Sequence, residues 1–275
     1  MGGQKPIFDF SMESVSQCTS VSVNSTGTLL AAGVEFQESN DNEESDEDDS
    51  KFGVLFYDLR STPPCLLGSY KESHSDAITA LSFHPTNPDL LFTGGDDGLV
   101  NIFDLKQSNE DDALQFTFNT VSSVAKIGFW NISESKSAIY ALTDDEKLFS
   151  WSVEDGDEIF SIEDSTKIFP SSGDSENKFL IDCLYSITSP GSIFALATTA
   201  DGMLSMARIR ASDKQGMTIF EDLSIGHTDM IRCLTWDEKQ GLLLTGGDDG
   251  LAIRSDMTKY LTKEGEPTRK RVRKK

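Results

Sequence analysis

Apolar and polar residues alternate in short runs along most of the chain, and turn residues separate these runs. The stretch that begins at His74 shows the order: an alternating run, a turn, a second apolar run, the acidic turn Asp96-Asp97-Gly98 and a third alternating run. Alternation with a period of two is typical of half-buried β-strands, and Asp-Gly between such runs favours a tight hairpin. The pattern therefore predicts an all-β chain of short strands joined by hairpins.

The same series occurs more than once. The heptapeptide TGGDDGL stands at Thr93–Leu99 and again at Thr245–Leu251, and His74–Phe83 aligns with His227–Trp236 ahead of the second copy. Further turn acids mark two units between them, and an upstream unit runs through Thr19–Val23, Leu29–Val34 and Gly53–Asp58. Five units of about 50 residues are thus visible, which indicates a repeat architecture.

Short motifs within the units resemble the WD-repeat family of β-propellers, whose blades have four strands. The motifs are Gly226-His227, His84–Pro88 and Asp97-Gly98, and the resemblance covers about residues 18–256. It implies an all-β WD-repeat propeller at 18–262 with five recognisable blades, after a lead at 1–17 and before a basic tail at 263–275. Phe103 and Ser255 stand where the family has Trp, so neither His-containing unit has the complete set. The structural network that the resemblance implies within the blades consists of His74, Asp97, Phe103, Asp145, Trp151, Asp201, His227 and Asp249.

The number of units bears on closure of the ring. Propellers of this kind usually have about seven blades. The resemblance therefore favours an incomplete seven-blade ring that lacks its first two blades. The alternative is closure at five blades, with Lys5–Phe10 as the outer strand of the last one.

Charge narrows the classes of partner. The net charge is −22, although Thr268–Lys275 contributes six positive charges and no acid, so the preceding residues carry −22 − 6 = −28. Such a body repels phosphate backbones, which argues against nucleic-acid binding by the folded part and favours basic proteins. No apolar stretch is long enough to cross a membrane, and the first residues lack an apolar signal core. A nuclear or nucleocytoplasmic protein is expected.

Catalytic chemistry finds little support. The chain has three histidines and four cysteines, without a C-x-x-C pair, so no metal or cofactor site is expected. We expect His84 in a surface loop and the cysteines reduced and buried. The pairs Asp96-Asp97 and Asp248-Asp249 lack the alternating ligands of a calcium loop and are interpreted as hairpin turns. A non-enzymatic chain is predicted.

Two charged segments lie beside the repeats. The insertion Glu38–Asp49 is acidic and has no hydrophobic residue, so 38–50 is expected to be a disordered loop. It is either a solvated loop or a negatively charged segment that attracts basic proteins or the chain's own tail. Ser45 is followed by acidic residues, as an acid-directed kinase requires of its substrate. The composition of the tail favours a nuclear-import signal. The alternatives are a contact with RNA or an acidic partner, and a plain soluble end. The import residues are Arg269, Lys270, Arg271, Arg273, Lys274 and Lys275.

A third motif suggests a specific partner. Tyr57-Asp58-Leu59-Arg60 resembles the Trp-Asp-x-Arg signature by which some WD-repeat proteins act as substrate receptors of cullin-type ubiquitin ligases, with Tyr57, Asp58 and Arg60 as the adaptor contact. The whole pattern predicts a protein-interaction scaffold or adaptor. The alternatives are a ligase substrate receptor and an acidic assembly factor or chaperone for basic ribosomal or chromatin proteins.

Overall fold

The computed structural model describes residues 15–37, 51–169, 177–185, 190–211, 213–220, 222–237 and 240–258. The segment Lys5–Phe10, the acidic insertion with Ser45, and the six basic residues of the tail lie outside this part of the chain.

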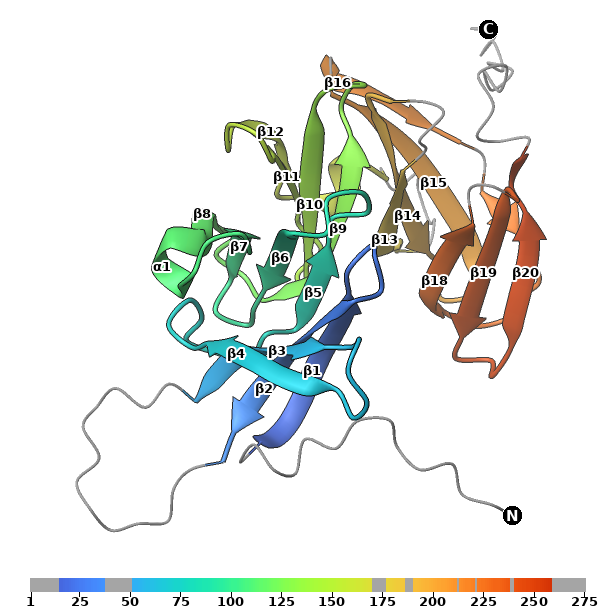
Figure 1. Ribbon diagram of the computed structural model, residues 1–275. Helices are drawn as coiled ribbons and strands as arrows, with labels where there is room; N and C mark the ends of the chain where they lie inside the picture. Colours follow the sequence, from blue (N-terminus) through green and yellow to red (C-terminus); the bar gives the residue numbers. More distant parts are fainter. Residues whose placement is uncertain are drawn as a thin grey trace, which may run out of the picture. The chain divides into compact units, whose positions relative to one another are not determined.

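The described residues form five antiparallel sheets, in accord with the five units expected from the sequence (Figure 1). The chain divides into two compact units, Met1–Phe129 with Ile139–Asp145, and Trp130–Ala138 with Glu146–Lys275. The third sheet has the strand order β12-β11-β10-β9, and its residues are shared between the units. Its strands are β9 (Val124–Asn131), β10 (Ser137–Thr143), β11 (Leu148–Ser152) and β12 (Glu158–Ile162), followed by the 3-10 turn η2 (Ser165–Lys167).

The first unit holds two complete four-stranded sheets, ordered β1-β2-β3-β4 and β5-β6-β7-β8. Strand β1 begins at Val15, which is paired with Phe36 of β2. The strands are β1 (Val15–Val23), β2 (Leu29–Phe36), β3 (Phe52–Asp58), β4 (Cys65–Tyr70), β5 (Ala80–Phe83), β6 (Leu90–Gly94), β7 (Leu99–Asp104) and β8 (Leu114–Asn119), with the short helix α1 (Glu110–Ala113) between the last two.

The second unit holds the fourth and fifth sheets. The fourth has the order β13-β14-β15-β16, with the short strand β17 also paired to β15, and the fifth has the order β18-β19-β20. The last sheet thus shows three strands among the described residues. The strands are β13 (Phe179–Tyr185), β14 (Ser192–Thr198), β15 (Met203–Arg210), β16 (Asp213–Ile219), β17 (Leu223–Ser224), β18 (Ile231–Asp237), β19 (Leu242–Gly247) and β20 (Ala252–Asp256).

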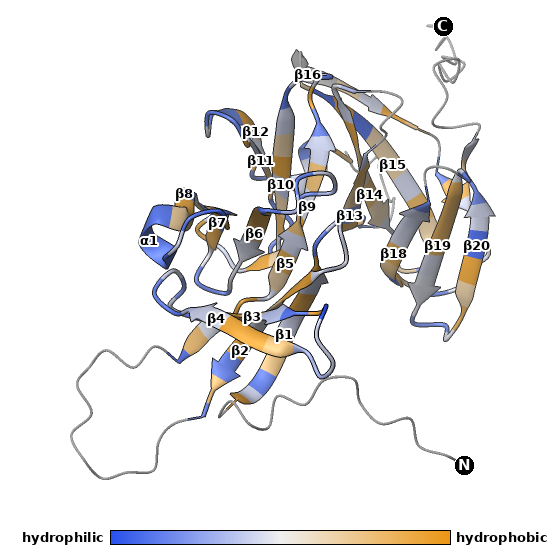
Figure 2. Ribbon diagram, in the orientation of Figure 1, coloured by the Kyte–Doolittle hydropathy of each residue, from blue (hydrophilic) through white to orange (hydrophobic). Residues whose placement is uncertain are grey.

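Several middle strands are buried on both faces, which the alternating pattern understates. In β10 every residue from Ser137 to Thr143 is buried, whereas the outer strand β8 alternates between half-buried and exposed positions. Figure 2 shows α1, by contrast, as a hydrophilic segment. A strand with two covered faces has no solvent side that requires polar residues. Alternation therefore marks the outer strands best.

The acidic-glycine hairpins have the same geometry in both copies of the heptapeptide. Gly98 and Gly250 adopt φ of 76° and 74°, a region that glycine enters without a steric penalty. The backbone N–H of Leu99 donates to Asp97 Oδ1 at 2.9 Å, and that of Leu251 donates to Asp249 Oδ1 at 3.0 Å. The aspartate thus closes the turn whose backbone the glycine permits.

One surface residue holds an unfavourable backbone conformation. Val121 has φ of 65° and is 85 % exposed, in the connection between β8 and β9. A β-branched residue is disfavoured there because its Cβ approaches the following carbonyl. The exposed side chain gains little from burial to offset that strain.

Replacing Val121 by asparagine should therefore stabilise the chain. Asparagine tolerates the left-handed region, so we expect Val121→Asn to raise the free energy of unfolding by about 1 kcal/mol. Urea unfolding measures this change. The matched control is Val21→Asn, an exposed valine in an extended strand, which should lower stability because valine is the better strand former. Equal losses from both substitutions would contradict the interpretation.

Candidate functional site

A hydrogen-bond network built on His74 ties a loop, a strand and a turn of the second sheet together. His74 Nδ1 lies 3.0 Å from Asp97 Oδ2, and His74 Nε2 lies 2.7 Å from Thr93 Oγ1. A carboxylate can only accept, so Nδ1 donates to Asp97, and Nε2 of a neutral ring then accepts from Thr93. The side chains of His74 and Asp97 are almost completely buried. The network therefore fixes the His74 loop against the Asp97 turn.

The fifth sheet repeats this geometry. His227 Nδ1 lies 2.9 Å from Asp249 Oδ2, and His227 Nε2 lies 2.9 Å from Thr245 Oγ1.

In the second sheet, burial acts to raise the pKa of Asp97, but hydrogen bonds from His74 and from the backbone of Leu99 and Ser75 outweigh this effect and lower the pKa. The carboxylate form is therefore favoured in the folded chain.

The intervening units use threonine instead of histidine at the turn aspartate. Thr143 Oγ1 donates to Asp145 Oδ1 at 2.6 Å, and Thr199 Oγ1 donates in the same way to Asp201. In both units the threonine precedes the aspartate by two residues. This spacing can be read from the sequence, but an analysis based on histidines does not detect it.

The third sheet has the tryptophan that is typical of the family. Trp151 is buried and stacks on Phe149 with ring centroids 5.7 Å apart.

Phe103 fills the corresponding position of the second sheet and is fully buried, packed 5.2 Å from the ring of Tyr70. Its apolar ring cannot donate to the network, and Asn101 on the same strand takes part instead. Asn101 Nδ2 donates to the carbonyl of Ser73 at 2.9 Å and lies 3.2 Å from His74 Nε2. An amide two residues before the usual Trp position therefore substitutes for the missing indole.

Glu110 is a further residue that motif reasoning missed. Its carboxylate accepts from the backbone N–H of Lys71 at 2.7 Å, from that of Glu72 at 3.0 Å, and from the hydroxyl of Ser73. Helix α1, capped by the side chain of Asn109, positions this carboxylate beside the loop that leads to His74. The contact joins residues that are far apart in sequence, so only the structure reveals it.

The turns of neighbouring sheets in the first unit bring together three exposed aspartates, Asp96, Asp144 and Asp145, which we call the acidic turn cluster. Ser123 Oγ lies 2.5 Å from Asp96 Oδ1 and 3.0 Å from Asp144 Oδ2. One hydroxyl proton can satisfy only one carboxylate at a time. The cluster therefore keeps a strongly negative field at the surface.

The proposed adaptor residues lie in different environments. Tyr57 is buried among Ala32, Val34 and Leu55, so its ring is not available to a partner. Arg60 is 72 % exposed and forms a bidentate pair with Asp58, at 2.8 Å from Nε and 2.7 Å from Nη2. The Arg60 side chain, helped by its backbone N–H, lowers the pKa of Asp58 to about 2.

Two expectations from the sequence are wrong. His84 is buried rather than in a surface loop, because its ring packs at 4.1 Å from the Phe129 ring and its Nδ1 accepts from the backbone N–H of Asn87 at 2.9 Å. Three of the four free cysteines, Cys18, Cys65 and Cys233, are exposed, and only Cys183 is buried. These three lie on β1, on the outer strand β4 and on β18 of the last sheet.

Among the described residues, no group of three or more His, Cys, Asp or Glu side chains has a geometry that could hold a metal ion. None of the helices in the described ranges is long and apolar enough to cross a membrane.

Removing the imidazole of the second sheet should destabilise the chain. In His74→Ala the buried Asp97 and Thr93 lose their partner, so we expect the free energy of unfolding to fall by about 2 kcal/mol. Urea unfolding at pH 7 tests this, with the exposed Lys106→Ala as the control that should change stability by less than about 0.5 kcal/mol. Equal effects of the two substitutions would show that the network does not stabilise the fold.

The acid form of Asp97 should weaken the same network. Because its pKa is lower in the folded chain, the carboxylate contributes fully above the unfolded value of about 3.9, and the contribution is lost as the pH falls through the folded pKa. The stability difference between the unmodified chain and Asp97→Asn should therefore be largest near neutral pH and shrink in acid. A pH-independent difference would contradict this assignment.

Comparison with known proteins places these features in a family. A model described as "WD domain, G-beta repeat" matches residues 65–104 and 220–253. The chain is 25 % identical over 197 residues to a WD repeat-containing protein 89 homolog of Dictyostelium discoideum, covering 71 % of this chain and 53 % of that protein. It is 27 % identical over 208 residues to the WD repeat-containing protein GTS1 of Arabidopsis thaliana, covering 72 % and 51 %. The chain thus spans about half the length of these curated relatives.

Solved structures with a similar fold are β-propellers. A chain of the Mitotic Checkpoint Complex matches with a TM-score of 0.61 at 17 % identity, over 87 % of this chain and 64 % of that one. The β-propeller domain of Myceliophteria thermophila Cps50 (Swd1) matches with a TM-score of 0.60 at 17 % identity, over 87 % and 67 %. These matches confirm the predicted all-β propeller fold. The chain thus carries WD repeats and is similar to a WD repeat-containing protein 89 homolog.

Proposed function

We propose that this chain is a non-enzymatic interaction scaffold whose acidic turn cluster binds a basic segment of a partner protein. WD-repeat propellers generally bind other proteins, and the finer assignment depends on one observation. Asp96 and Asp144 come from the turns of two neighbouring sheets and contact the same hydroxyl of Ser123. A lysine or arginine of a partner would relieve this concentration of negative charge.

The surroundings of the cluster support a basic and partly apolar ligand. Ser122 Oγ donates to Asp145 Oδ2 at 2.8 Å, so the third carboxylate of the cluster is also held by the β8–β9 connection. Val121, the preceding residue, exposes 85 % of its surface there. An apolar side chain beside fixed carboxylates fits a partner segment that carries a hydrophobic residue next to its cations.

The net charge of −22 extends this preference beyond the cluster, because an acidic body attracts basic proteins at long range. Basic ribosomal or chromatin proteins are the class of partner that such a scaffold would assemble or protect. We also propose that the tail directs nuclear import, that Ser45 is phosphorylated and that the protein is nuclear or nucleocytoplasmic. The tail and Ser45 lie outside the described residues, so these three proposals depend on the sequence alone.

Neutralising two acids of the cluster should weaken binding of a basic partner. We expect Asp96→Asn with Asp144→Asn to raise the Kd for a Lys/Arg-rich peptide by about tenfold at low salt, measured by fluorescence anisotropy. The effect should shrink as salt is added. The matched control is Glu134→Gln with Glu163→Gln, which removes the same amount of charge from two exposed positions elsewhere. Equal loss in both double variants would show that only net charge matters, and no loss would exclude the cluster.

The second candidate function is that of a substrate receptor for a cullin-type ubiquitin ligase. Its support is the exposure and rigidity of Arg60, whose guanidinium is held in place by Asp58 while most of it faces solvent. An arginine with a fixed orientation is a residue type enriched at interaction hot spots. Burial of Tyr57 limits the contact to the arginine and its immediate turn.

Charge reversal at Arg60 tests the second function. Arg60→Glu should abolish recovery of ligase-adaptor subunits with the tagged chain from cell lysate, because glutamate opposes Asp58 and reverses the anchor charge. The neighbouring sheet offers a matched control, since Lys106 N–H donates to Asp104 Oδ1 at 3.1 Å just as Arg60 N–H donates to Asp58 Oδ1 at 2.9 Å. Lys106→Glu should leave recovery unchanged. Adaptor recovery that survives Arg60→Glu would exclude this function.

A further inference from the structure

The second unit contains a hollow of about 300 Å³. Residues of β12, of the turn η2 and of the β15–β16 hairpin line it, and all of them belong to this unit. A hollow of this volume lies at the lower end of the range of ligand sites, so it fits one or two side chains of a ligand rather than a large cofactor.

The walls of the hollow are largely apolar. Strand β12 contributes Phe160 and Ile162, which are both buried. Strand β15 contributes the buried Ile209, and β16 contributes the half-buried Met217. The pairing of β15 with β16 is irregular here, because residues 214–217 stand opposite Ile209 alone. Such a bulge bends a strand out of regular pairing, and the hollow can therefore cover an apolar side chain of a ligand.

Two exposed cations stand at this apolar surface. Lys167 and Arg210 both line the hollow, and within the described part of the chain neither of them forms an ion pair. The carboxylate of Asp164, just before Lys167, is engaged by Thr166, whose backbone N–H and hydroxyl donate to Asp164 Oδ1 at 3.0 and 2.6 Å. These bonds lower the pKa of Asp164, and the charge of Lys167 is only a minor cause. Both cations therefore lack a described carboxylate partner and are available to an anion.

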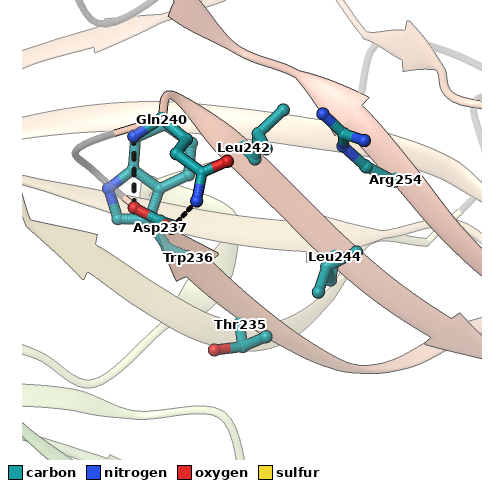
Figure 3. A pocket seen from close by; sticks show the side chains of 7 residues that line it. All are labelled: Thr235, Trp236, Asp237, Gln240, Leu242, Leu244 and Arg254. Carbon is teal, nitrogen blue, oxygen red and sulfur yellow. Dashed lines mark hydrogen bonds between the residues drawn. The ribbon is translucent and has the colours of Figure 1, made fainter.

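A positive surface is an exception in this chain. One acid, the exposed Glu158, lines the same hollow, so its charged groups sum to 2 − 1 = +1 in a chain of net charge −22. Figure 3 shows a contrasting hollow in the last sheet, whose lining contains Arg254 and Asp237, one charge of each sign. Apolar walls also strengthen the attraction between an anion and the two cations, because they exclude water on one side.

We propose that the hollow of the second unit binds an acidic segment of a partner protein in which a hydrophobic residue is flanked by carboxylates. The hydrophobic side chain contacts Ile209 and Met217, while Lys167 and Arg210 each pair with a carboxylate. Arginine suits this role because its guanidinium binds a carboxylate through two N–H groups. The ligand has the opposite charge to the basic segment proposed for the acidic turn cluster, so either proposal can fail without the other.

Titration calorimetry of the intact chain with a synthetic peptide tests the proposal. The probe carries a phenylalanine between two pairs of glutamates and has both ends blocked. At physiological salt we expect a Kd of about 100 µM, since the contact is small. Replacing the phenylalanine by alanine removes the apolar contact, and replacing the glutamates by glutamines removes the charge pairs. Each change should raise the Kd by about tenfold or more.

A double variant of the chain locates the contact. Lys167→Gln with Arg210→Gln should raise the Kd for the acidic peptide by about tenfold or more. The matched control is Lys106→Gln with Arg254→Gln, which removes the same charge from exposed positions outside the hollow. Because salt screens distant charges, the control should raise the Kd by less than about twofold. All four side chains are exposed, so circular dichroism should be unchanged in both double variants.

Glu158 provides a change of opposite sign. Glu158→Gln removes the one described acid that lines the hollow and should lower the Kd by about threefold. The matched control is Glu134→Gln, an exposed acid elsewhere, which should leave the Kd unchanged. Opposite shifts from cations and acid of the same hollow distinguish a local contact from a general effect of net charge.

Four results would overturn the proposal. The first is no binding at a peptide concentration of about 1 mM. The second is an equal loss of affinity in the two double variants, which would assign binding to net charge. The third is the same Kd for the phenylalanine and alanine peptides, which would show that the apolar walls are not used. The fourth is binding that appears only after residues 170–176 are replaced by glycine and serine, which would assign the hollow to the chain's own segment.

Discussion

The buried contact between a histidine, an aspartate and a threonine is the interaction on which the second and fifth sheets depend. His74 comes from a loop before the sheet, Thr93 from a middle strand and Asp97 from the turn that follows it. Because the three groups are buried, each needs its partner, and their mutual contacts fix the loop and the turn at once. The exposed acids of the proposed binding surface, such as Asp96, lie directly beside these fixed residues. The rigidity of the interior thus determines the geometry of the surface.

The other units show that the constraint can be met by different chemistry. Where histidine is absent, Thr143 and Thr199 bond to the turn aspartate two residues later. Where Trp is absent, Asn101 bonds to the loop carbonyl and to His74. The turn aspartate is common to the last four units, and it accepts from whatever donor the unit provides. Hydrogen-bond satisfaction rather than residue identity is what the repeats share.

Local alternation and residues a fixed distance apart predicted the strands, the repeats and the hairpin turns, whereas the propeller fold was implied by the resemblance to the WD-repeat family. Sequence reasoning failed for His84 and for the exposed cysteines, since burial depends on which strand lies against another. It also missed Glu110, whose partners lie in a loop nearly one full unit earlier. The candidate interaction surface was only partly predictable. Asp96 was interpreted as a turn residue, and its closeness to Asp144 through Ser123 arises from tertiary packing.

The heptapeptide TGGDDGL has a consequence for how this chain can vary. Its two copies are identical, yet a Cβ added to Gly94 would meet the side chains of Val124 and Ile127, whereas one added to Gly246 would meet, among the described residues, only the sulfur of Cys233. Substitution of this glycine is thus limited by a neighbouring sheet in the first copy and by a single movable side chain in the second. Mutational tolerance should differ between the two copies, and a profile that averages over repeats would assign both the same value. Identity between repeats records common origin, while the permitted substitutions are decided by the neighbours that each copy has acquired.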